Sequence, residues 1–160
     1  MGTLIVLRHA KAEHTFGVPD SARVLTGRGR RDATAAGSWL RAEGLHPDQV
    51  LCSPSQRTRD TLECLGVDAP VAYPERIYGN DVDDLLDLIH AADEAIGTLL
   101  LIGHNPSFHQ LVHDLTGDAP ETFPTCALAV ITLGTWAAAG PATATLQHIW
   151  TPKTPNPRAL

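Results

Sequence analysis

The sequence predicts an α/β sandwich built on a mainly parallel sheet. Short apolar runs alternate with amphipathic helical segments along most of the chain, a pattern typical of parallel sheets covered by helices. The run at residues 4–7 is apolar without interruption, as expected for a strand that is buried on both faces. The chain has 160 residues, of which 43% are hydrophobic and 19% charged, so we expect a single globular domain over residues 1–160.

The first predicted helix begins after a loop that contains Gly17, Pro19 and Asp20. Thr26 is a suitable N-cap residue, and a helix from there to about Glu43 would place small and apolar side chains on one face. Those side chains belong to Ala33, Ala36, Gly37 and Leu40, and Gly44 is a plausible stop. Residues 49–52 predict a second strand. Ser53 then offers an N-cap and Pro54 the first position of a helix that runs to about Leu65.

The second half of the chain continues the same alternation. An amphipathic helix is expected around residues 85–92 and a strand over 98–102, and the following helix would start with Asn105 as its cap and Pro106 in its first turn. Gly117 closes that helix. Residues 127–133 and 143–150 predict two last strands, which either pair as a hairpin or bracket the sheet. The proline-containing tail, residues 151–160, is expected to be irregular.

Composition excludes several classes of function. The formal net charge is −6 and the pI is about 5.7, with no basic stripe, so a nucleic-acid partner is not expected. The apolar run at residues 4–7 is too short for a signal sequence or a membrane span, so no membrane association is expected. The three cysteines have no metal-ligand spacing, and their odd number argues against a disulfide framework. A cytoplasmic location fits best.

Polar residues follow three of the predicted strands. The first strand ends in Arg8-His9, the second in Ser53-Pro54 with Arg57 shortly after, and the third in Gly103-His104-Asn105. Because open α/β sheets bind ligands beyond the carboxyl ends of their strands, these residues would meet at one point if the three strands are neighbours. The starts of the two following helices would add backbone N–H groups and partial positive charge.

This set of residues points to phosphoryl transfer. An arginine fork matches phosphate oxygens and keeps its proton, and a neutral imidazole can attack phosphorus and form a covalent intermediate. Arg8 and Arg57 are expected to lower the pKa of His9, which keeps its ring neutral and nucleophilic at pH 7. A protonated His104 would stabilise the charge on the transferred group.

Two other patterns carry less weight. Cys52 and Arg57 are one residue short of the Cys-x5-Arg spacing of cysteine phosphatases, and Cys52 lies within the predicted strand, so a buried thiol is expected. His109 and His113 have the helical spacing of metal ligands, but the apolar face of that helix leaves them pointing to solvent, and no third ligand is evident. No metal site is therefore expected.

The chain resembles the histidine phosphatase superfamily, which has the phosphoglycerate-mutase-like fold. Residues 7–13, Leu-Arg-His-Ala-Lys-Ala-Glu, look like the Arg-His-Gly signature in the variant of the small bacterial phosphohistidine phosphatases of the SixA type. Asp20, Arg23, residues 25–26 and Gly29 resemble the segment that follows in that branch. Ser53-Pro54, Arg57 and Thr61 match the Ser-Pro-x-x-Arg motif, and residues 103–105 match the Gly-His-Asn motif.

The resemblance implies a three-layer α/β/α fold of the minimal kind, without the large insertions that cover the pocket in bigger members. It implies His9 as the phosphorylated nucleophile, Arg8, Arg57 and His104 as phosphate ligands, inorganic phosphate as a product, and no cofactor. Larger members carry an acid that protonates the leaving group. Here the best-placed candidate is Glu75, with a loop carboxylate paired to Arg76 as the alternative reading; Glu13 and Asp20 are further candidates.

The predicted function is that of a monomeric phosphohistidine phosphatase acting on a protein of the histidine phosphotransfer type. The first alternative is a phosphatase of small phosphorylated metabolites that uses the same site. The second is a non-catalytic phosphate-binding module, which the presence of His9, both arginines and His104 makes less favoured.

Overall fold

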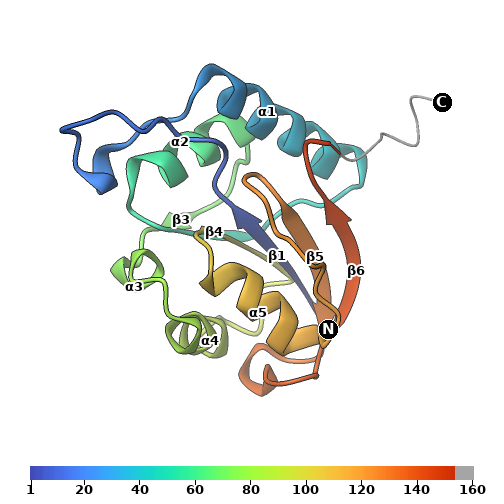
Figure 1. The fold of residues 1–160 in the computed structure, drawn as a ribbon. Coiled ribbons are helices and arrows are strands. Elements are labelled where there is room, and N and C mark those ends of the chain that lie inside the picture. Colours follow the sequence, from blue (N-terminus) through green and yellow to red (C-terminus); the bar gives the residue numbers. More distant parts are fainter. Residues whose placement is uncertain (154–160) are drawn as a thin grey trace.

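A six-stranded sheet forms the centre of the computed structural model, which describes residues 1–153 (Figure 1). The strand order is β3-β2-β4-β1-β5-β6. Four strands run parallel to one another: β1 (Gly2–Arg8), β2 (Gln49–Cys52), β3 (Val71–Ala72) and β4 (Thr98–Gly103). Strand β5 (Leu128–Leu133) is antiparallel to β1, and β6 (Thr145–Trp150) is antiparallel to β5. The mainly parallel sheet is confirmed, and the last two strands pair with each other at one edge.

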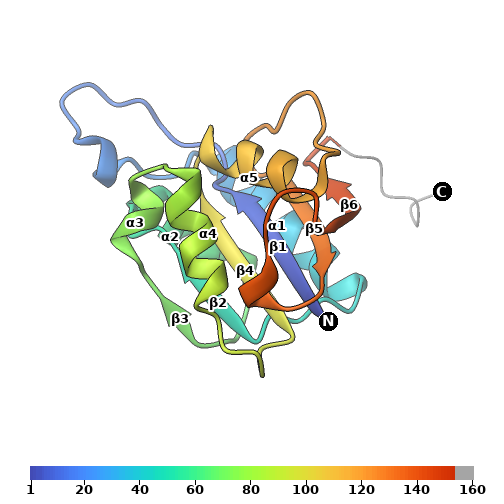
Figure 2. The same cartoon turned by 90° about the horizontal axis from the view of Figure 1, so that it is seen from below.

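Both faces of the sheet are covered, which explains the uninterrupted apolar strands. In β1, Leu4 and Val6 contribute to one hydrophobic cluster, whereas Ile5 and Leu7 contribute to the other. The first cluster packs under α4 (Val82–His90) and α5 (Ser107–Thr116), and the second under α1 (Gly27–Ala42) and α2 (Gln56–Leu65). Figures 1 and 2 show the two helical layers on opposite sides of the sheet. The predicted α/β class is thus realised as three layers.

Helix α1 forms as the sequence predicts. The Thr26 side chain accepts a hydrogen bond from the Gly29 backbone N–H at 2.9 Å and so caps the helix. Gly44 has a φ of +70°, the left-handed conformation that glycine adopts without strain after a helix. The buried stripe packs against α2, where Gly37 lies so close to the Leu65 carbonyl that a larger residue would not fit. This close approach holds α2 beside α1 and therefore fixes where Arg57 lies.

Two predicted helix starts are wrong, by two residues in α2 and by one residue in α5. Helix α2 begins at Gln56 with Ser55 as its cap, so Ser53 and Pro54 belong to the preceding turn. Helix α5 begins at Ser107 with Pro106 as its cap. In each case the turn frees a polar side chain at the strand end, Ser53 in the first and Asn105 in the second, to hydrogen-bond elsewhere.

Some elements were not predicted. The two-residue strand β3 and the single-turn helix α3 (Glu75–Tyr78) are too short to give a periodic pattern, and 3-10 turns lie at Asp20–Ala22 and Trp136–Ala138. The expected irregular tail, residues 151–160, is described only as far as Lys153, and the remainder lies outside the described residues. No helix within residues 1–153 has the length and apolarity needed to cross a membrane.

Candidate active site

The three strands with polar ends are neighbours in the sheet. Strand β4 lies between β1 and β2, and all three are parallel. The register pairs Arg8 with Gly103 and Cys52 with Ile102, so the residues that follow these strands emerge at one edge. The condition on which the predicted site depends is therefore met.

A cavity of about 630 Å³ opens at this edge. It brings together four of the five predicted site residues: Arg8, His9, Arg57 and His104. The fifth, Glu75, is exposed on α3 and is not among the residues that line the cavity. The other lining residues are Lys11, Ala12, His14, Asp20, Arg23, Tyr78, Asn80, Asn105 and Thr125.

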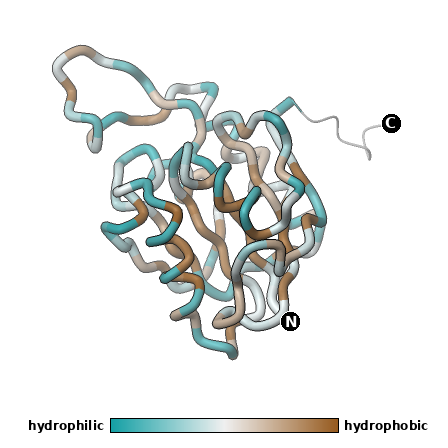
Figure 3. The backbone as a smooth tube through the Cα atoms, turned by 60° about the horizontal axis from the view of Figure 1, so that its bottom comes forward, coloured by the Kyte–Doolittle hydropathy of each residue, from teal (hydrophilic) through white to brown (hydrophobic). Residues whose placement is uncertain are grey.

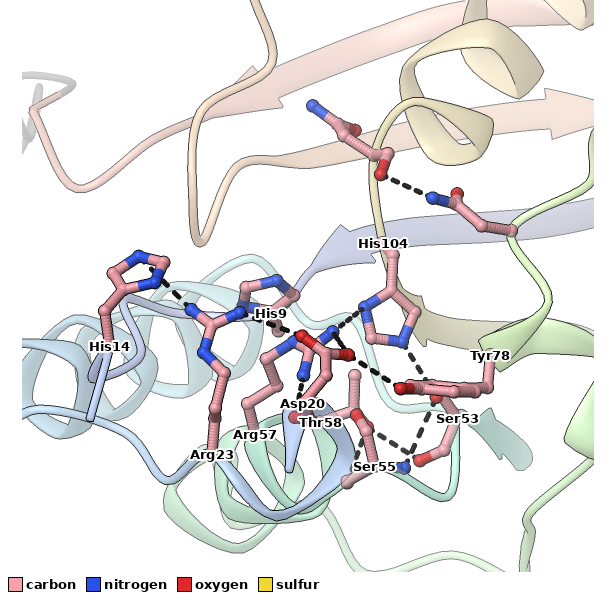
Figure 4. A network of polar contacts seen from close by, with 12 residues as sticks. His9, His14, Asp20, Arg23, Ser53, Ser55, Arg57, Thr58, Tyr78 and His104 are labelled. Atoms are coloured by element: carbon pink, nitrogen blue, oxygen red, sulfur yellow. Dashed lines mark hydrogen bonds and ion pairs between the residues drawn. The ribbon is translucent and has the colours of Figure 1, made fainter. Parts of the chain in front are cut away.

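His9 presents one nitrogen of its ring to chemistry. Its Nδ1 atom lies 2.7 Å from the carbonyl oxygen of Ala10, and because a carbonyl only accepts, Nδ1 carries the proton and donates it. In the neutral ring, Nε2 therefore keeps its lone pair. The His9 side chain is buried, and the ring centroids of His9 and His104 are 5.4 Å apart (Figure 4). This is the tautomer that a nucleophile acting through Nε2 needs.

Thr61 holds Ala10 in place, and Ala10 in turn orients the His9 ring. The backbone N–H of Ala10 donates to Thr61 Oγ1 at 3.0 Å, and the Thr61 hydroxyl donates to the Arg57 carbonyl oxygen at 2.8 Å. Thr61 is fully buried on α2. A chain of hydrogen bonds thus connects α2 to Ala10 and from there to the His9 ring, which limits its rotation.

Burial sets the charge state of His9. It lowers the pKa of His9 to about 3, with smaller contributions in the same direction from His104, Arg57 and Arg8, while the hydrogen bond to Ala10 acts in the opposite direction. The predicted direction of the pKa shift is therefore confirmed, and both arginines contribute to it as predicted, but desolvation is the largest cause. The ring is neutral at pH 7.

His104 is also neutral at pH 7. Its Nδ1 accepts from the Arg57 guanidinium at 3.4 Å, which leaves Nε2 to donate to Ser53 Oγ at 2.8 Å. Burial and the positive charge of Arg57 lower the pKa of His104 to about 4. The charge-stabilising role expected of His104 requires its protonated form, and this ring gains a proton well below pH 7 unless a nearby negative charge raises its pKa. The negative charge of a bound phosphate would favour the protonated ring.

Asp20 accepts hydrogen bonds from the guanidinium of Arg57. The two terminal nitrogens of Arg57 donate to the Asp20 carbonyl oxygen at 2.7 Å and to its carboxylate at 3.0 Å, and the Tyr78 hydroxyl donates to the same carboxylate oxygen at 2.7 Å (Figure 4). These bonds, led by that from Tyr78, lower the pKa of Asp20 to about 2. A carboxylate therefore lies where an arginine fork would bind phosphate.

Arg8 and Asn105 share one acceptor. Arg8 and the Asn105 amide both donate to the carbonyl oxygen of Phe123, at 3.1 Å and 2.7 Å. Burial lowers the pKa of Arg8. Within the described part of the chain, the Nε atoms of Arg8 and Arg57 have no hydrogen-bond partner. Each of these two N–H groups is therefore a buried donor without a partner in this part of the chain.

The start of α5 contributes less to anion binding than the sequence suggested. The Asn80 side chain accepts from the Ser107 backbone N–H at 3.0 Å, and the Asn105 side chain accepts from that of His109 at 3.3 Å. Two of the N–H groups expected to face a ligand are therefore already paired. Asn80 and Tyr78 could not be anticipated, because they belong to a segment with no periodic signal.

The structure also bears on three alternatives considered from the sequence: a cysteine nucleophile, a histidine metal site and an ion pair between Glu75 and Arg76. Burial raises the pKa of the Cys52 thiol to about 12, which removes the thiolate that a cysteine mechanism needs. His113 is exposed as expected, but His109 is half-buried, where its ring contacts the Pro120 carbonyl oxygen at 2.7 Å. No group of three or more potential metal-ligating side chains occurs among residues 1–153. Arg76 pairs with Asp84 and Asp87 rather than with Glu75.

Comparison with known proteins agrees with this geometry. A family model for the histidine phosphatase superfamily (branch 1) matches residues 4–78. Phosphohistidine phosphatase SixA of Escherichia coli (strain K12) is 31% identical over 137 residues, covering 81% of this chain and 84% of that protein. The chain belongs to the histidine phosphatase superfamily. It is a phosphatase, and its predicted family and fold are confirmed.

Other relatives of this histidine phosphatase align over almost its whole length. An uncharacterised protein of Mycobacterium tuberculosis is 38% identical over 158 residues, which cover 92% of this chain and all of that protein. A solved structure named as a candidate SixA from Nakamurella multipartitia has a TM-score of 0.86 at 35% identity, covering 96% of this chain and 97% of that one. The structure of the protein histidine phosphatase SixA complexed with tungstate has a TM-score of 0.83 at 27% identity, with coverage of 94% and 97%.

Proposed function

We propose that this phosphatase hydrolyses phosphohistidine on a protein of the histidine phosphotransfer type, with His9 as a covalent nucleophile. The proposed phosphate ligands are Arg8, Arg57 and His104. The relative from E. coli and the structure with tungstate, both named for SixA, support the substrate class. The observation that carries the proposal is a neutral nucleophile in a cationic cavity whose carboxylate is held ionised.

The reaction takes place in two steps. The Nε2 lone pair of His9 attacks phosphorus, the phosphorus–nitrogen bond of the substrate breaks, and the released imidazole of the substrate leaves with a proton. Water then attacks the phosphoryl group on His9, which yields inorganic phosphate and restores the neutral ring. Arg8 and Arg57 stabilise the charge on the equatorial oxygens, which is where an enzyme accelerates phosphoryl transfer most.

The acid–base groups of the cavity favour a nitrogen leaving group. An alkoxide needs a proton in the transition state, and a general acid typically contributes about 10²–10⁴-fold. Asp20, the carboxylate among the residues lining the cavity, is held ionised by Tyr78 and Arg57, and Glu75 lies elsewhere. Phosphohistidine can bring its own proton on the imidazole. A site without a protonated carboxyl group therefore suits phosphohistidine better than an alkyl phosphate.

The second candidate is hydrolysis of small phosphate esters at the same site. The cavity volume of about 630 Å³ favours it, since small-molecule sites are commonly about 300–1,000 Å³.

We place the protein in the cytoplasm, where its cysteines, free among residues 1–153, would stay reduced. We further propose that the single domain acts as a monomer.

A panel of three substrates separates these functions. The enzyme is incubated with a histidine-phosphorylated phosphotransfer domain, an alkyl phosphate and an activated aryl phosphate, and released inorganic phosphate is measured. We expect rapid hydrolysis of the phosphoprotein and the aryl phosphate and at least about 10²-fold lower kcat/KM for the alkyl phosphate. Fast turnover of the alkyl phosphate with the phosphoprotein untouched would establish the small-ester function instead.

A further inference from the structure

Residues 13–24 form an arm that leaves the body of the protein beside the cavity. The neck of the arm is closed by antiparallel contacts: the Glu13 N–H donates to the Val24 carbonyl oxygen at 2.8 Å, and Ala12 pairs with Leu25. Arg23 donates to the Glu13 carbonyl oxygen at 2.8 Å across the same neck. Figures 1 and 3 show the arm projecting away from the sheet and both helical layers.

The base of the arm is part of the active-site cavity. His14, Asp20 and Arg23 line it, and Asp20 connects the arm to Arg57 on α2. Arg23 contacts both Asp20, at 3.2 Å, and His14, at 3.3 Å. Whatever molecule places a phosphoryl group near His9 therefore comes to lie next to the arm.

The arm exposes three hydrophobic side chains. Phe16 is fully exposed, and Val18 and Val24 are 38% and 40% exposed. These are three of the six exposed large hydrophobic residues among residues 1–153, and they fall within nine consecutive positions. Single exposed hydrophobic residues are common, but an exposed group of them often marks a contact surface. Burying the Phe16 side chain against a partner would remove its apolar surface from water, which favours association.

We propose that the arm is the docking surface for the phosphorylated protein, with Phe16 as its principal anchor. This rests on the function proposed above. A small ester inside the cavity leaves Phe16 and Val18 without a contact, because neither residue lines the cavity. A protein that presents its phosphohistidine to His9 extends past the rim and covers the arm. Lys11, which is exposed and lines the cavity, adds positive charge that would attract a negatively charged partner surface around the phosphohistidine.

The test compares Phe16→Ala and Val18→Ala with the control Val71→Ala. Val71 is as exposed as Val18, at 37% against 38%, but lies on β3 at one edge of the sheet and is not a cavity residue. The substrates are a histidine-phosphorylated phosphotransfer domain and an activated aryl phosphate. We expect Phe16→Ala to lower kcat/KM for the phosphoprotein by about tenfold, mainly through KM, as for a central aromatic contact. The aryl phosphate should react within about twofold of the unmodified enzyme, and Val71→Ala should change neither reaction.

Each other outcome overturns a specific statement. Unchanged phosphoprotein turnover in Phe16→Ala, or an equal loss on both substrates, contradicts docking by the arm and leaves the proposed function in place. Absence of phosphoprotein turnover by the unmodified enzyme, with rapid turnover of the aryl phosphate, contradicts the proposed function and the docking role together.

Discussion

The chemistry of individual residues depends on which hydrogen bond each imidazole makes. A single carbonyl oxygen, that of Ala10, assigns the His9 proton to Nδ1, and the guanidinium of Arg57 assigns the His104 proton to Nε2. Burial keeps both rings neutral at pH 7. The sequence predicts the neutral ring of His9 but attributes it to the two arginines, because desolvation depends on what packs around the strand ends and no motif shows it.

The neutral histidines predict how stability depends on pH. The folded-state pKa values of His9 and His104 are about 3 and about 4, below the 6.5 of the free side chain, so the unfolded chain binds more protons in this window. Stability from these groups is complete above pH 6.5 and is lost as the pH falls towards 3. Urea unfolding between pH 7 and pH 4 should show this decline. His9→Asn/His104→Asn should flatten it, whereas exposed His113→Asn should not; an unchanged slope in the double variant would contradict the assignment.

We expect Arg57 to accelerate the reaction mainly by stabilising the transition state. Arg57→Ala is expected to lower kcat/KM by about 10²-fold or more, and Arg57→Lys should recover only part, because a point charge does not replace the fork. Arg59→Ala is the matched control: Arg59 lies on the same helix, but its guanidinium covers the Tyr73 ring at 4.1 Å. Steady-state kinetics on an aryl phosphate measure all three. Full activity in Arg57→Ala would remove Arg57 from the site.

The carboxylate of Asp20 should compete with anions. Asp20→Asn removes one negative charge from the guanidinium of Arg57, so vanadate should bind about threefold to tenfold more tightly, a modest gain because the Asp20 side chain is 54% exposed. Glu75→Gln makes the same change of charge outside the cavity and should leave vanadate inhibition as it is. Competitive inhibition constants provide the comparison. Weaker vanadate binding in Asp20→Asn would show that Asp20 helps rather than opposes anion binding.

Among the elements of structure, long periodic segments were predictable and short connections were not. The run of apolar residues in β1 and the Thr26 cap of α1 each have a local signal, and both form as predicted. The starts of α2 and α5 differ from the prediction because Ser53 hydrogen-bonds across the site to His104, and Asn105 lies one position before the cap, where its side chain accepts from the His109 N–H and donates to the Phe123 carbonyl oxygen. The three motifs at strand ends could be expected to meet, on the condition that their strands are neighbours, because the carboxyl ends of parallel strands share one edge. The pairing of Asp20 with Arg57 depends on the path of the arm, which no pattern in the sequence specifies.

The close packing of β4 against α5 can be tested at Gly103. A methyl group at Gly103 would lie 2.5 Å from the Phe108 ring and 2.8 Å from Ile77. Gly103→Ala should therefore lower the free energy of unfolding by about 1–3 kcal/mol, as overpacking does, and reduce kcat by displacing His104. Gly134 has no neighbour within 4 Å of the added methyl, so Gly134→Ala should be close to neutral. Urea unfolding compares the two variants; equal stability would contradict this packing argument.

At the scale of the whole molecule, an acidic protein concentrates positive charge at one site. The net charge is −6, yet Arg8, Lys11, Arg23 and Arg57 all line the cavity, with Asp20 as their acidic counterpart. Such a cavity attracts an anionic group without favouring nonspecific contacts elsewhere on the surface. The fold supplies this arrangement through three parallel strands whose carboxyl ends meet beside the arm.

Chemical trapping of the phosphorylated enzyme tests the central claim most directly. The enzyme is mixed briefly with a phosphohistidine substrate, quenched in alkali, and mapped by mass spectrometry of proteolytic fragments. We predict one phosphoryl group on His9, stable in alkali and lost in acid, and none in His9→Asn, which should also have no turnover. A phosphoryl group on another residue, or normal turnover by His9→Asn, would contradict the account.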